Sequence, residues 1–295
     1  RTRMAEQGVQ EQAAQFALSR LSIQAELASD YVLLRGLDAQ AAVYRSAIRY
    51  YQAAVEVTKL RLSGAIAPGM DVSRAEAQLY ATQAQETDIK SQRDVMEHTI
   101  AVLVNQAPAS FHIAPVDSLP FQVSTPPLVL PSTLLERRPD IAMAERRMAQ
   151  ANRAIGVSRA AVYPHVTCNA MTGFMDSGFD LASLYNAMYQ FGASAVVPLF
   201  QGGLRRADLQ RSWSQYRQAE DIYRGTVLDA FREVEDNLTR SGRLKTQVEQ
   251  EKSAVDAAVR TQGMTMALYT GGLTNYLDVV VAQVAALNAR IALVQ

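Results

Sequence analysis

Few side chains in this sequence have the residue types and the spacing that a catalytic or metal-binding site requires. The three histidines, His98, His112 and His165, are scattered, and none has the close spacing of zinc ligands. Cys168 is the only cysteine, which excludes an internal disulfide and a cysteine-rich metal site. No nucleophile is paired with a base, no glycine-rich loop could bind phosphate, and no catalytic carboxylates are paired. We therefore expect a protein that is not an enzyme and that uses no cofactor or metal.

One stretch concentrates charge between apolar residues without matching a catalytic pattern. Residues 130–145 read LPSTLLERRPDIAMAE, and the positions of interest are Ser132, Arg137, Arg138, Pro139 and Asp140. Ser132 can serve as the N-cap of a helix that starts there. Pro139 should break its first turns, and Asp140 can cap the helix that continues. We interpret the stretch as a helix joint whose arginines pair with Asp140, Glu136 or a neighbouring helix; an anion-binding site is the alternative.

Two aspartates follow glycine-containing turns. SGAIAPGM (63–70) directly precedes Asp71, and TGGLTN (270–275) lies shortly before Asp278. The turn residues that bend the chain are Gly64, Pro68, Gly69, Gly271 and Gly272. An aspartate in this place can accept hydrogen bonds from the free N–H groups of a helix. The simplest interpretation of both aspartates is therefore that they are N-caps of helices that run back from the turns.

Long helices must carry these turns. Between Thr2 and about Leu62 there is no proline and there are only two glycines, and apolar residues recur at three- and four-residue spacing. A helix of about sixty residues spans about 90 Å, which a compact globule of this size cannot use. A second uninterrupted stretch runs from about Leu204 to Tyr269. The sequence thus predicts two helical rods, each followed by a turn and a returning helix.

The residue pattern changes between Tyr163 and Phe200. YPHVTCNAMT and QFGASAVVPLF alternate with a period of two, so that Val166 and Cys168 share one face of a strand and Thr167 lies on the other. We expect two strands joined by a loop. Aromatic residues near their ends form either a girdle at a membrane interface or a packed loop: Tyr163, Phe174, Phe179, Tyr185, Tyr189 and Phe200. Arg205 and Arg206 follow, where they contact either lipid headgroups or helices.

The expected organisation has five parts. These are a first long helical hairpin with a truncated start (1–105), a connector with six of the ten prolines (106–131), a helix (132–161), the strand pair with its loop (162–200) and a second long hairpin (201–295). Residues 60–79 align with 267–286 at a constant shift, which places Gly64 on Gly271 and Asp71 on Asp278. This match favours duplication of one hairpin.

Composition agrees with long helices and argues against some partners. The 29 basic and 29 acidic residues balance, so no bulk attraction for nucleic acid or for an anionic membrane is implied. Glycine, proline and tryptophan are scarce, as is typical of long helices. We expect no membrane-spanning helix, because no stretch approaches the required run of about 20 apolar residues. The start, RTRMAEQGVQ, carries no hydrophobic signal segment, and we expect a fragment or a processed form.

Neither the rods nor the strands can be stable alone. A polar hairpin of this length buries too little apolar area without neighbours, and two strands form a marginal sheet in water. Both facts predict an oligomer in which rods stand around an axis and strand pairs close a shared barrel without free edges. Strands with one apolar and one small polar face suit a barrel in lipid with a wet lumen.

Several blocks carry a family resemblance. LPSTLLERRPDI followed by AE, then AVYPHV, VPLFQGGLRRADL and FREVEDNL, in this order and spacing, resemble the TolC-like outer membrane factors of Gram-negative tripartite efflux pumps, especially the lipoprotein-type branch. The resemblance implies a mainly α fold with a short β part. It further implies a homotrimer with a 12-stranded outer-membrane barrel and a long periplasmic α-barrel. The family's signal, lipidated cysteine, first strand pair and first helix would precede Arg1.

The resemblance also assigns residues at the closed tip of such a channel. Asp278 matches an aspartate of a constriction ring, and Tyr269 with Asp71 matches a link between the two hairpins. Val281 stands where many members have a second aspartate, and Thr274 stands near the place of an arginine that would complete the link. A ring of like carboxylates favours cations. Capping and constriction can coexist in Asp71 and Asp278.

The function that the resemblance implies is passive export through an outer-membrane duct that extends into the periplasm. Expected partners are further copies of the chain, outer-membrane lipid, a periplasmic adaptor that contacts the hairpin tips, and an inner-membrane transporter reached through the adaptor. The exit duct of a type I protein secretion system is an alternative of the same class. A purely helical scaffold or adaptor, in which the strand segments are loops, is an alternative of another class.

Overall fold

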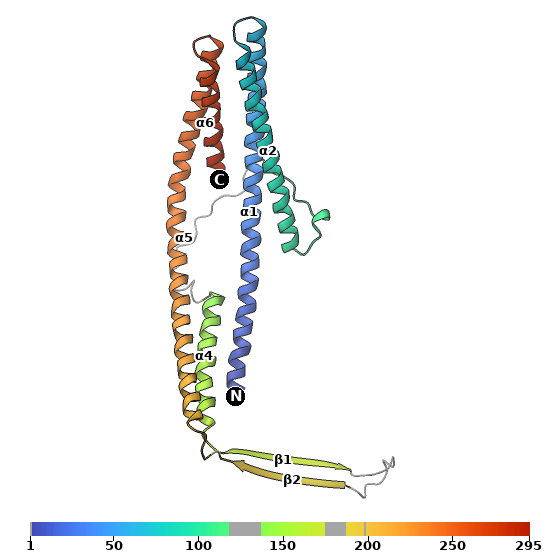
Figure 1. Cartoon of the computed structure of the whole chain (residues 1–295), viewed down its shortest axis with the longest axis vertical. Coiled ribbons are helices and arrows are strands. Elements are labelled where there is room, and N and C mark those ends of the chain that lie inside the picture. Colours follow the sequence, from blue (N-terminus) through green and yellow to red (C-terminus); the bar gives the residue numbers. More distant parts are fainter. Residues whose placement is uncertain (1, 118–136, 175–186, 198) are drawn as a thin grey trace. The chain divides into compact units, whose positions relative to one another are not determined.

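The computed structural model describes residues 2–117, 137–174, 187–197 and 199–295. Its elements are α1 (Thr2–Ser63), α2 (Gly69–Leu103), the short helix η1 (Pro108–Ser110), α4 (Pro139–Ala160), β1 (His165–Phe174), β2 (Ala187–Val196), α5 (Leu204–Thr270) and α6 (Tyr276–Val294) (Figure 1). The chain divides into one unit of residues 1–19 and 129–233 and a second unit of residues 20–128 and 234–295. The two expected rods are α1 and α5, and the mainly helical fold with a short β part is confirmed.

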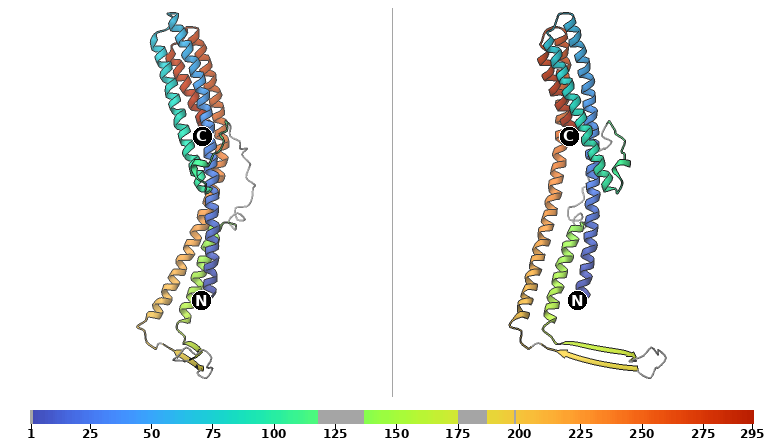
Figure 2. Two further views of the ribbon diagram at one scale, coloured as in Figure 1. Left: turned by 90° about the vertical axis from the view of Figure 1, so that its right-hand side faces the viewer. Right: turned by 45° about the vertical axis from the view of Figure 1, so that its right-hand side comes forward.

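The second unit is a four-helix bundle at the hairpin tips. Its core draws on the ends of α1 and α5 and the starts of α2 and α6, and it comprises Ala47, Ile48, Tyr51, Val55, Ala75, Leu79, Tyr269, Tyr276 and Val279. Tyr51, Tyr276 and Val279 are at most 2% exposed. The ends of α1 and α5 and the starts of α2 and α6 lie side by side at the tip (Figure 2). The larger apolar cluster of this unit lies there, and burial of each large side chain contributes about 1.5–3 kcal/mol.

The two tip turns have the same hydrogen bonds at a constant shift of sequence. Gly64 N–H donates to Leu60 O (3.1 Å) and Ile66 N–H to Arg61 O (2.9 Å); Gly271 N–H donates to Ala267 O (3.0 Å) and Leu273 N–H to Leu268 O (2.9 Å). The left-handed position is Ala65 in the first turn, with φ 56°, and Gly272 in the second, with φ 78°. Such a left-handed residue is a common way to end a helix. Matching bonds at matching positions support the predicted duplication.

The predicted N-caps are wrong. α2 begins at Gly69 after the N-cap Pro68, and α6 begins at Tyr276 after the N-cap Asn275. Asp71 and Asp278 are therefore third residues of their helices. In the second turn the Asn275 side chain takes the expected role, because its Oδ1 accepts from Asp278 N–H at 3.1 Å. In the first turn proline provides the start, since its fixed φ suits an extended N-cap and it needs no donor.

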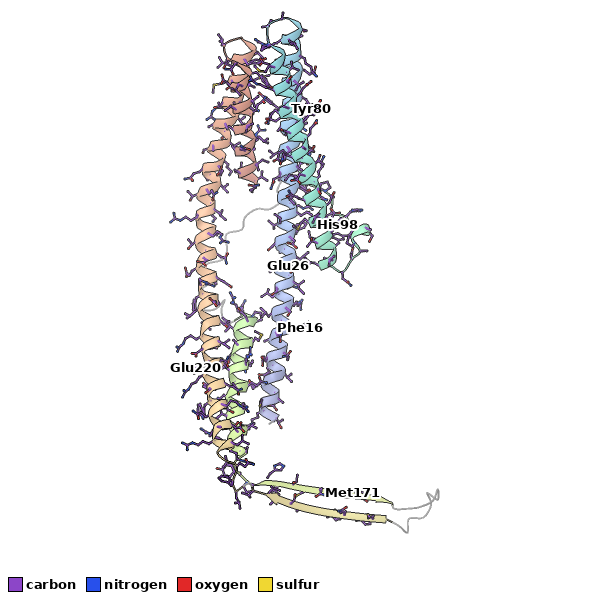
Figure 3. All side chains as sticks on the ribbon, viewed as in Figure 1. Phe16, Glu26, Tyr80, His98, Met171 and Glu220 are labelled. Carbon is purple, nitrogen blue, oxygen red and sulfur yellow. The ribbon has the colours of Figure 1, made fainter. Side chains whose placement is uncertain are left out.

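The first unit joins the start of α1, α4, the strand pair and the first part of α5. The helices touch at Ser158 and Ser212, whose hydroxyls lie 2.7 Å apart, and at Gly8, beside the Gln150 side chain. The strands are antiparallel and 10 residues long, and their register pairs His165 with Val196. They are the two strands expected from alternation. Figure 3 shows Met171 on this pair and Phe16 projecting from α1.

α6 corrects one expectation about membrane helices. Tyr276–Val294 is, by length and composition alone, apolar enough to cross a membrane, so the expectation that no stretch approaches this property is wrong. In the structure this helix lies in the bundle, where Tyr276, Val279 and Gln283 are buried. We interpret it as a packed helix of the tip, because one face of it closes the core described above.

Candidate functional site

The two hairpins are linked at their tips by three side chains. The Tyr269 hydroxyl donates to Asp71 Oδ2 at 3.0 Å, and both residues are buried. Arg61 Nη1 donates to Thr270 O at 2.7 Å, and its guanidinium carbon lies 4.6 Å from the centre of the Tyr269 ring. We call Arg61, Asp71 and Tyr269 the tip lock. It joins the end of α1 and the start of α2 to the end of α5.

Burial determines the electrostatics of the tip lock. Desolvation and the neighbouring Asp71 carboxylate raise the pKa of Tyr269 to about 12, so its hydroxyl is a donor throughout the physiological pH range. The ring packs edge-on against Tyr276, with centroids 5.1 Å apart, and burial raises the pKa of Tyr276 to about 12. A buried carboxylate requires a hydrogen-bond partner. Tyr269 supplies it to Asp71.

The expected tip residues fall into a buried group and an exposed group. Asp71 and Tyr269 make the contact that the resemblance implied, whereas Asp278 is exposed and Val281 is 61% exposed. The Thr274 hydroxyl donates to Asp278 Oδ2, within the same hairpin. The turn residues are exposed at the two tips: Gly64, Pro68, Gly69, Gly271 and Gly272. The side chains of Asp278 and Val281 are thus exposed and are not part of the buried core.

Arg61 was missed by the sequence analysis. The arginine that completes the link was sought near Thr274, but it comes from the end of α1 and lies 209 residues before its acceptor, Thr270. A Cβ added at Gly272 would lie 4.0 Å from Arg61 Nη2. A basic residue in the last turn of a helix before a glycine turn is a common arrangement. No pattern in one sequence marks it as a link between hairpins.

A second polar cluster holds the chain that leaves α2 against α1 and α2. Arg93 donates from Nε to Asp38 Oδ1 (2.8 Å) and also pairs with Glu97. Arg35 donates to Asp38 Oδ2 (2.9 Å) and to Ala114 O (2.7 Å). Asp38 is 3% exposed. We call Arg35, Asp38, Arg93 and Glu97 the connector clamp, because its arginines also bind main-chain carbonyls of residues 113–114.

Glu97 is the acidic residue of the connector clamp whose pKa is clearly shifted. Burial alone would raise its pKa, but hydrogen bonds from His112 and Arg93 outweigh this effect, so the pKa of Glu97 lies below its usual range. His112 Nδ1 lies 3.0 Å from Glu97 Oε1. Buried ion pairs that are fully hydrogen-bonded favour one arrangement of the chain. The clamp therefore positions the start of the connector.

The helix joint is an arginine bridge. α4 begins at Pro139, its N-cap is Arg138, and Asp140 Oδ1 accepts from Ile141 N–H at 2.9 Å. Arg138 Nη2 donates to Asp140 Oδ2 (2.7 Å) and to Glu233 Oε2 on α5 (2.8 Å). Arg137 is exposed at the preceding turn, and Ser132 lies outside the described residues. Arg138 thus pairs with Asp140 and also reaches Glu233 on the neighbouring rod, which are two of the partners that the joint interpretation predicts.

The strand register separates two faces. Val166, Cys168 and Ala170 pair with Ala195, Ala193 and Phe191 on one face. On the other face Thr167 pairs with Ser194 and their hydroxyls lie 3.1 Å apart, and Asn169 pairs with Gly192. A Cβ at Gly192 would come within 2.7 Å of Asn169 Oδ1, so glycine leaves room for that amide. Over residues 166–170 and 191–195 one face is apolar and the other is small and polar, as predicted; beyond this stretch the second face also carries Met171, Met188 and Val196.

Metal ligands do not gather in the described parts of the chain. Within residues 2–117, 137–174, 187–197 and 199–295, no group of three or more His, Cys, Asp or Glu side chains could hold a metal ion. Most polar groups of the three clusters described above bind one another or main-chain carbonyls, while Arg35 Nε and Arg61 Nε are buried without a partner. Their arrangement joins helices and holds main-chain carbonyls in place.

Comparison with known proteins assigns this fold to a family. The model of the family described as outer membrane efflux protein matches residues 130–295. The chain belongs to the outer membrane efflux protein family. It is 27% identical over 290 residues to the pyoverdine export outer membrane protein OpmQ of Pseudomonas aeruginosa, with 95% of this chain and 60% of that protein covered. It is 28% identical over 286 residues to the outer membrane protein OprJ of the same species, covering 92% and 57%.

Solved structures of outer membrane efflux proteins share the fold. The outer membrane protein VceC of Vibrio cholerae has a TM-score of 0.87 at 28% identity, with 99% of this chain and 70% of that chain covered. The outer-membrane channel OprN has a TM-score of 0.91 at 26% identity, covering 99% and 66%. The present chain spans about 60% of the length of the curated relatives it matches. Membership places the protein in the outer membrane of Gram-negative bacteria, in a family of transport proteins.

Proposed function

We propose that this chain forms part of an outer-membrane exit duct through which a tripartite pump passively exports small molecules. The observation that carries the proposal is the strand pair: two 10-residue strands that present one apolar face and one small polar face over residues 166–170 and 191–195, joined to helices of the outer membrane efflux protein fold. A membrane-spanning strand needs about 9–11 residues, and alternation of lipid-facing and lumen-facing residues is the mark of such barrels. A duct needs neither catalysis nor a cofactor.

Exposed apolar side chains support assembly as a homotrimer. On the rod Phe16 is 71% exposed, whereas the exposed Phe191 (81%) and Val166 (63%) lie on the strand face that would contact lipid. A two-stranded sheet has two free edges, which a closed barrel removes. Copies of the chain around an axis would cover the rods and complete the barrel. The helical-scaffold alternative required loops in place of strands, and the described β1 and β2 argue against it.

The tip lock would hold the periplasmic end closed, and Asp278 would line the aperture. Asp278 is exposed beside the second turn and is not used to cap α6. Around a threefold axis, three such carboxylates would attract cations and repel one another. The exposed turns on both hairpins would contact a periplasmic adaptor, through which an inner-membrane transporter supplies the energy.

The test is cation selectivity of the full-length channel in planar bilayers. Asp278→Ala should lower the preference for potassium over chloride about threefold or more, because the acidic ring is the main local charge in the aperture. The control is Asp256→Ala, which removes an exposed aspartate from α5 more than two turns before the tip. Equal selectivity in both variants would remove Asp278 from the pore, and a purified protein that never conducts would contradict the duct itself.

A further inference from the structure

A small pocket lies in the second unit, where three helices of the bundle meet (Figure 2). Its volume is about 310 Å³, which is at the small end of the range for ligand pockets. Of its polar lining, α1 supplies Arg49 and Tyr50, α5 supplies Gln262, and α6 supplies Gln283 and Arg290. The lining contains no aspartate or glutamate. Because its walls come from both hairpins, a molecule bound there would contact both.

Gln283 has a buried side chain whose hydrogen-bonding capacity is unused. The residue is 1% exposed, and neither its amide nitrogen nor its amide oxygen has a partner in the described parts of the chain. The Tyr276 hydroxyl is a neighbour of this amide, but no hydrogen bond joins the two. Arg35 and Arg61 also leave one nitrogen unpaired, yet each binds through another nitrogen. A buried amide without any partner is costly, so the pocket lacks both an acceptor and a donor.

Two arginines give the pocket a positive charge that its lining does not balance. Arg49 is exposed and Arg290 is half-buried, and neither forms a hydrogen bond or an ion pair with the described residues. No carboxylate stands three or four residues from either arginine along its helix, where a helical ion pair would form. In contrast, Arg35, Arg93 and Arg138 all bind carboxylates. Guanidinium groups without carboxylates favour an anion in this pocket over water alone.

The pocket lies apart from both ends of this chain. Ser46 is the lining residue nearest to Arg1 along α1, and a helix of that length separates them by about 65 Å. α6 starts at the tip and runs away from it, so residues that follow Gln295 in a longer chain would lie farther from the tip than Arg290. Helical side chains lean toward the N-terminus of their helix, which here is the direction of the tip. Gln283 is already buried, so another segment could reach its amide only through the pocket.

We propose that this pocket binds a small phosphate-bearing anion that also carries an O–H donor, such as hydrogen phosphate. Its oxygens would accept from Arg49, Arg290 and the Gln283 amide N–H, and its O–H would donate to the Gln283 carbonyl oxygen. Tyr50 and Gln262 would offer further donors from α1 and α5. The bound anion would link α1 of the first hairpin to α6 of the second and so reinforce the tip lock. Passive export requires no ligand at this place, so the inference goes beyond the proposed function.

The test measures phosphate binding to the full-length channel in detergent by isothermal titration calorimetry. Arg49→Gln with Arg290→Gln should weaken binding about tenfold or more, because charged hydrogen bonds from two helices are lost. The matched control is Arg20→Gln with Arg260→Gln, which removes one exposed arginine from α1 and one from the second hairpin, both outside the pocket. The control should bind like the wild type. A wild-type channel that binds no phosphate would overturn the inference, since water or a second copy of the chain would then fill the pocket.

Two comparisons test the donor and the buried amide. Sulfate has acceptor oxygens but no O–H at neutral pH, so it should bind about threefold or more weaker than phosphate; equal binding would overturn the assignment. Glycerol 3-phosphate carries hydroxyl donors, and its affinity relative to phosphate distinguishes a phosphate ester from the free anion as the source. Gln283→Met keeps the length of the side chain and removes the amide. It should weaken phosphate binding about threefold or more, and unchanged binding would contradict the site.

Planar-bilayer recordings separate this inference from the proposed function. A channel that conducts but binds phosphate equally in both double variants would contradict the pocket and leave the duct intact. A channel that binds phosphate through Arg49 and Arg290 but never conducts would contradict the duct and leave the pocket intact. If the Arg49–Arg290 double variant does not assemble, Arg49→Gln alone is measured, because this arginine is exposed and its loss leaves the core unchanged. It should weaken binding about threefold or more, and no weakening would contradict the inference.

Discussion

At the scale of single residues, Tyr269 combines a hydrogen bond and a ring contact that one substitution can separate. The hydroxyl binds Asp71, while the ring lies against Arg61 and Tyr276. Tyr269→Phe keeps the ring and removes the donor from a carboxylate that is 6% exposed. We expect the free energy of unfolding of the channel to fall by about 1–3 kcal/mol, because the carboxylate stays buried without its partner.

Conductance gives a second measurement of the same substitution. If the tip lock holds the aperture closed, Tyr269→Phe should raise the single-channel conductance, and adding Asp71→Ala should raise it further. Tyr80→Phe is the control, because Tyr80 is on α2 and 63% exposed. Urea unfolding and planar-bilayer recordings test the two effects separately. Wild-type conductance in the double variant would show that this contact only stabilises the fold.

Asp140 gives a prediction in which pH decides the outcome. The hydrogen bonds from Arg138 hold the pKa of Asp140 below its usual range. A carboxyl group with a lowered folded pKa contributes stability above its unfolded pKa of about 3.9 and loses it as the pH falls through the folded value. Arg138→Gln should therefore lower the free energy of unfolding by about 1–2 kcal/mol at neutral pH. The difference from the wild type should shrink below about pH 4.

Arg137→Gln is the control for the Arg138 substitution. The two arginines are adjacent, but Arg137 is exposed, so its loss should leave the stability within about 0.5 kcal/mol of the wild type at every pH. The bond from Arg138 to Glu233 adds little, because that glutamate side chain is 55% exposed. Chemical unfolding of the three channels between acidic and neutral pH makes the comparison. Equal losses in both variants would contradict the bridge from Arg138.

At the scale of elements, the two tip turns offer a paired test. They share hydrogen bonds at equivalent positions, yet Ala65 adopts the left-handed conformation that glycine adopts at 272. A residue with a Cβ costs about 1–2 kcal/mol in that conformation. Ala65→Gly should therefore stabilise the tip by about 0.5–1 kcal/mol, and Gly272→Ala should destabilise it by about 1 kcal/mol or more. Hydrogen exchange of the flanking amides measures both. Effects of the same sign would contradict the equivalence of the turns.

The elements also show how far sequence reasoning reaches. α1 and α5 were predictable, because long stretches without proline and with three- and four-residue periodicity leave few other structures. β1 and β2 followed from alternation. The helix starts were less certain, since proline or asparagine one turn earlier competes with aspartate for the N-cap. Several neighbouring residues can serve as the N-cap of a helix, and a single sequence does not show which of them does.

Contacts between distant elements were beyond the sequence. Arg61 reaches Thr270 across 209 positions, and Arg35 reaches Ala114 across 79. Periodicity describes which face of a helix is apolar, but it does not say which backbone carbonyl a long side chain will meet. The contact of Tyr269 with Asp71 was available only through the family resemblance.

At the scale of the whole molecule, the strand pair determines whether the chain lines a channel through lipid. Cys168 lies on the apolar face with Val166, and Thr167 lies on the polar face opposite Ser194. In a closed barrel these neighbouring positions would face lipid and the wet lumen, respectively. Both are exposed in the single chain, so assembly alone should make them different.

Thiol labelling of the full-length channel in outer membranes tests this difference. Cys168, with any other cysteine replaced, should react at least about tenfold more slowly with a charged, membrane-impermeant maleimide than Thr167→Cys in a Cys168→Ala background, because the reagent enters the lumen and not the lipid. Denatured protein should remove the difference, which controls for the intrinsic reactivity of each thiol. Equal rates in intact membranes would mean that the two faces see the same solvent. The strands would then not separate lipid from water, and the duct would need another wall.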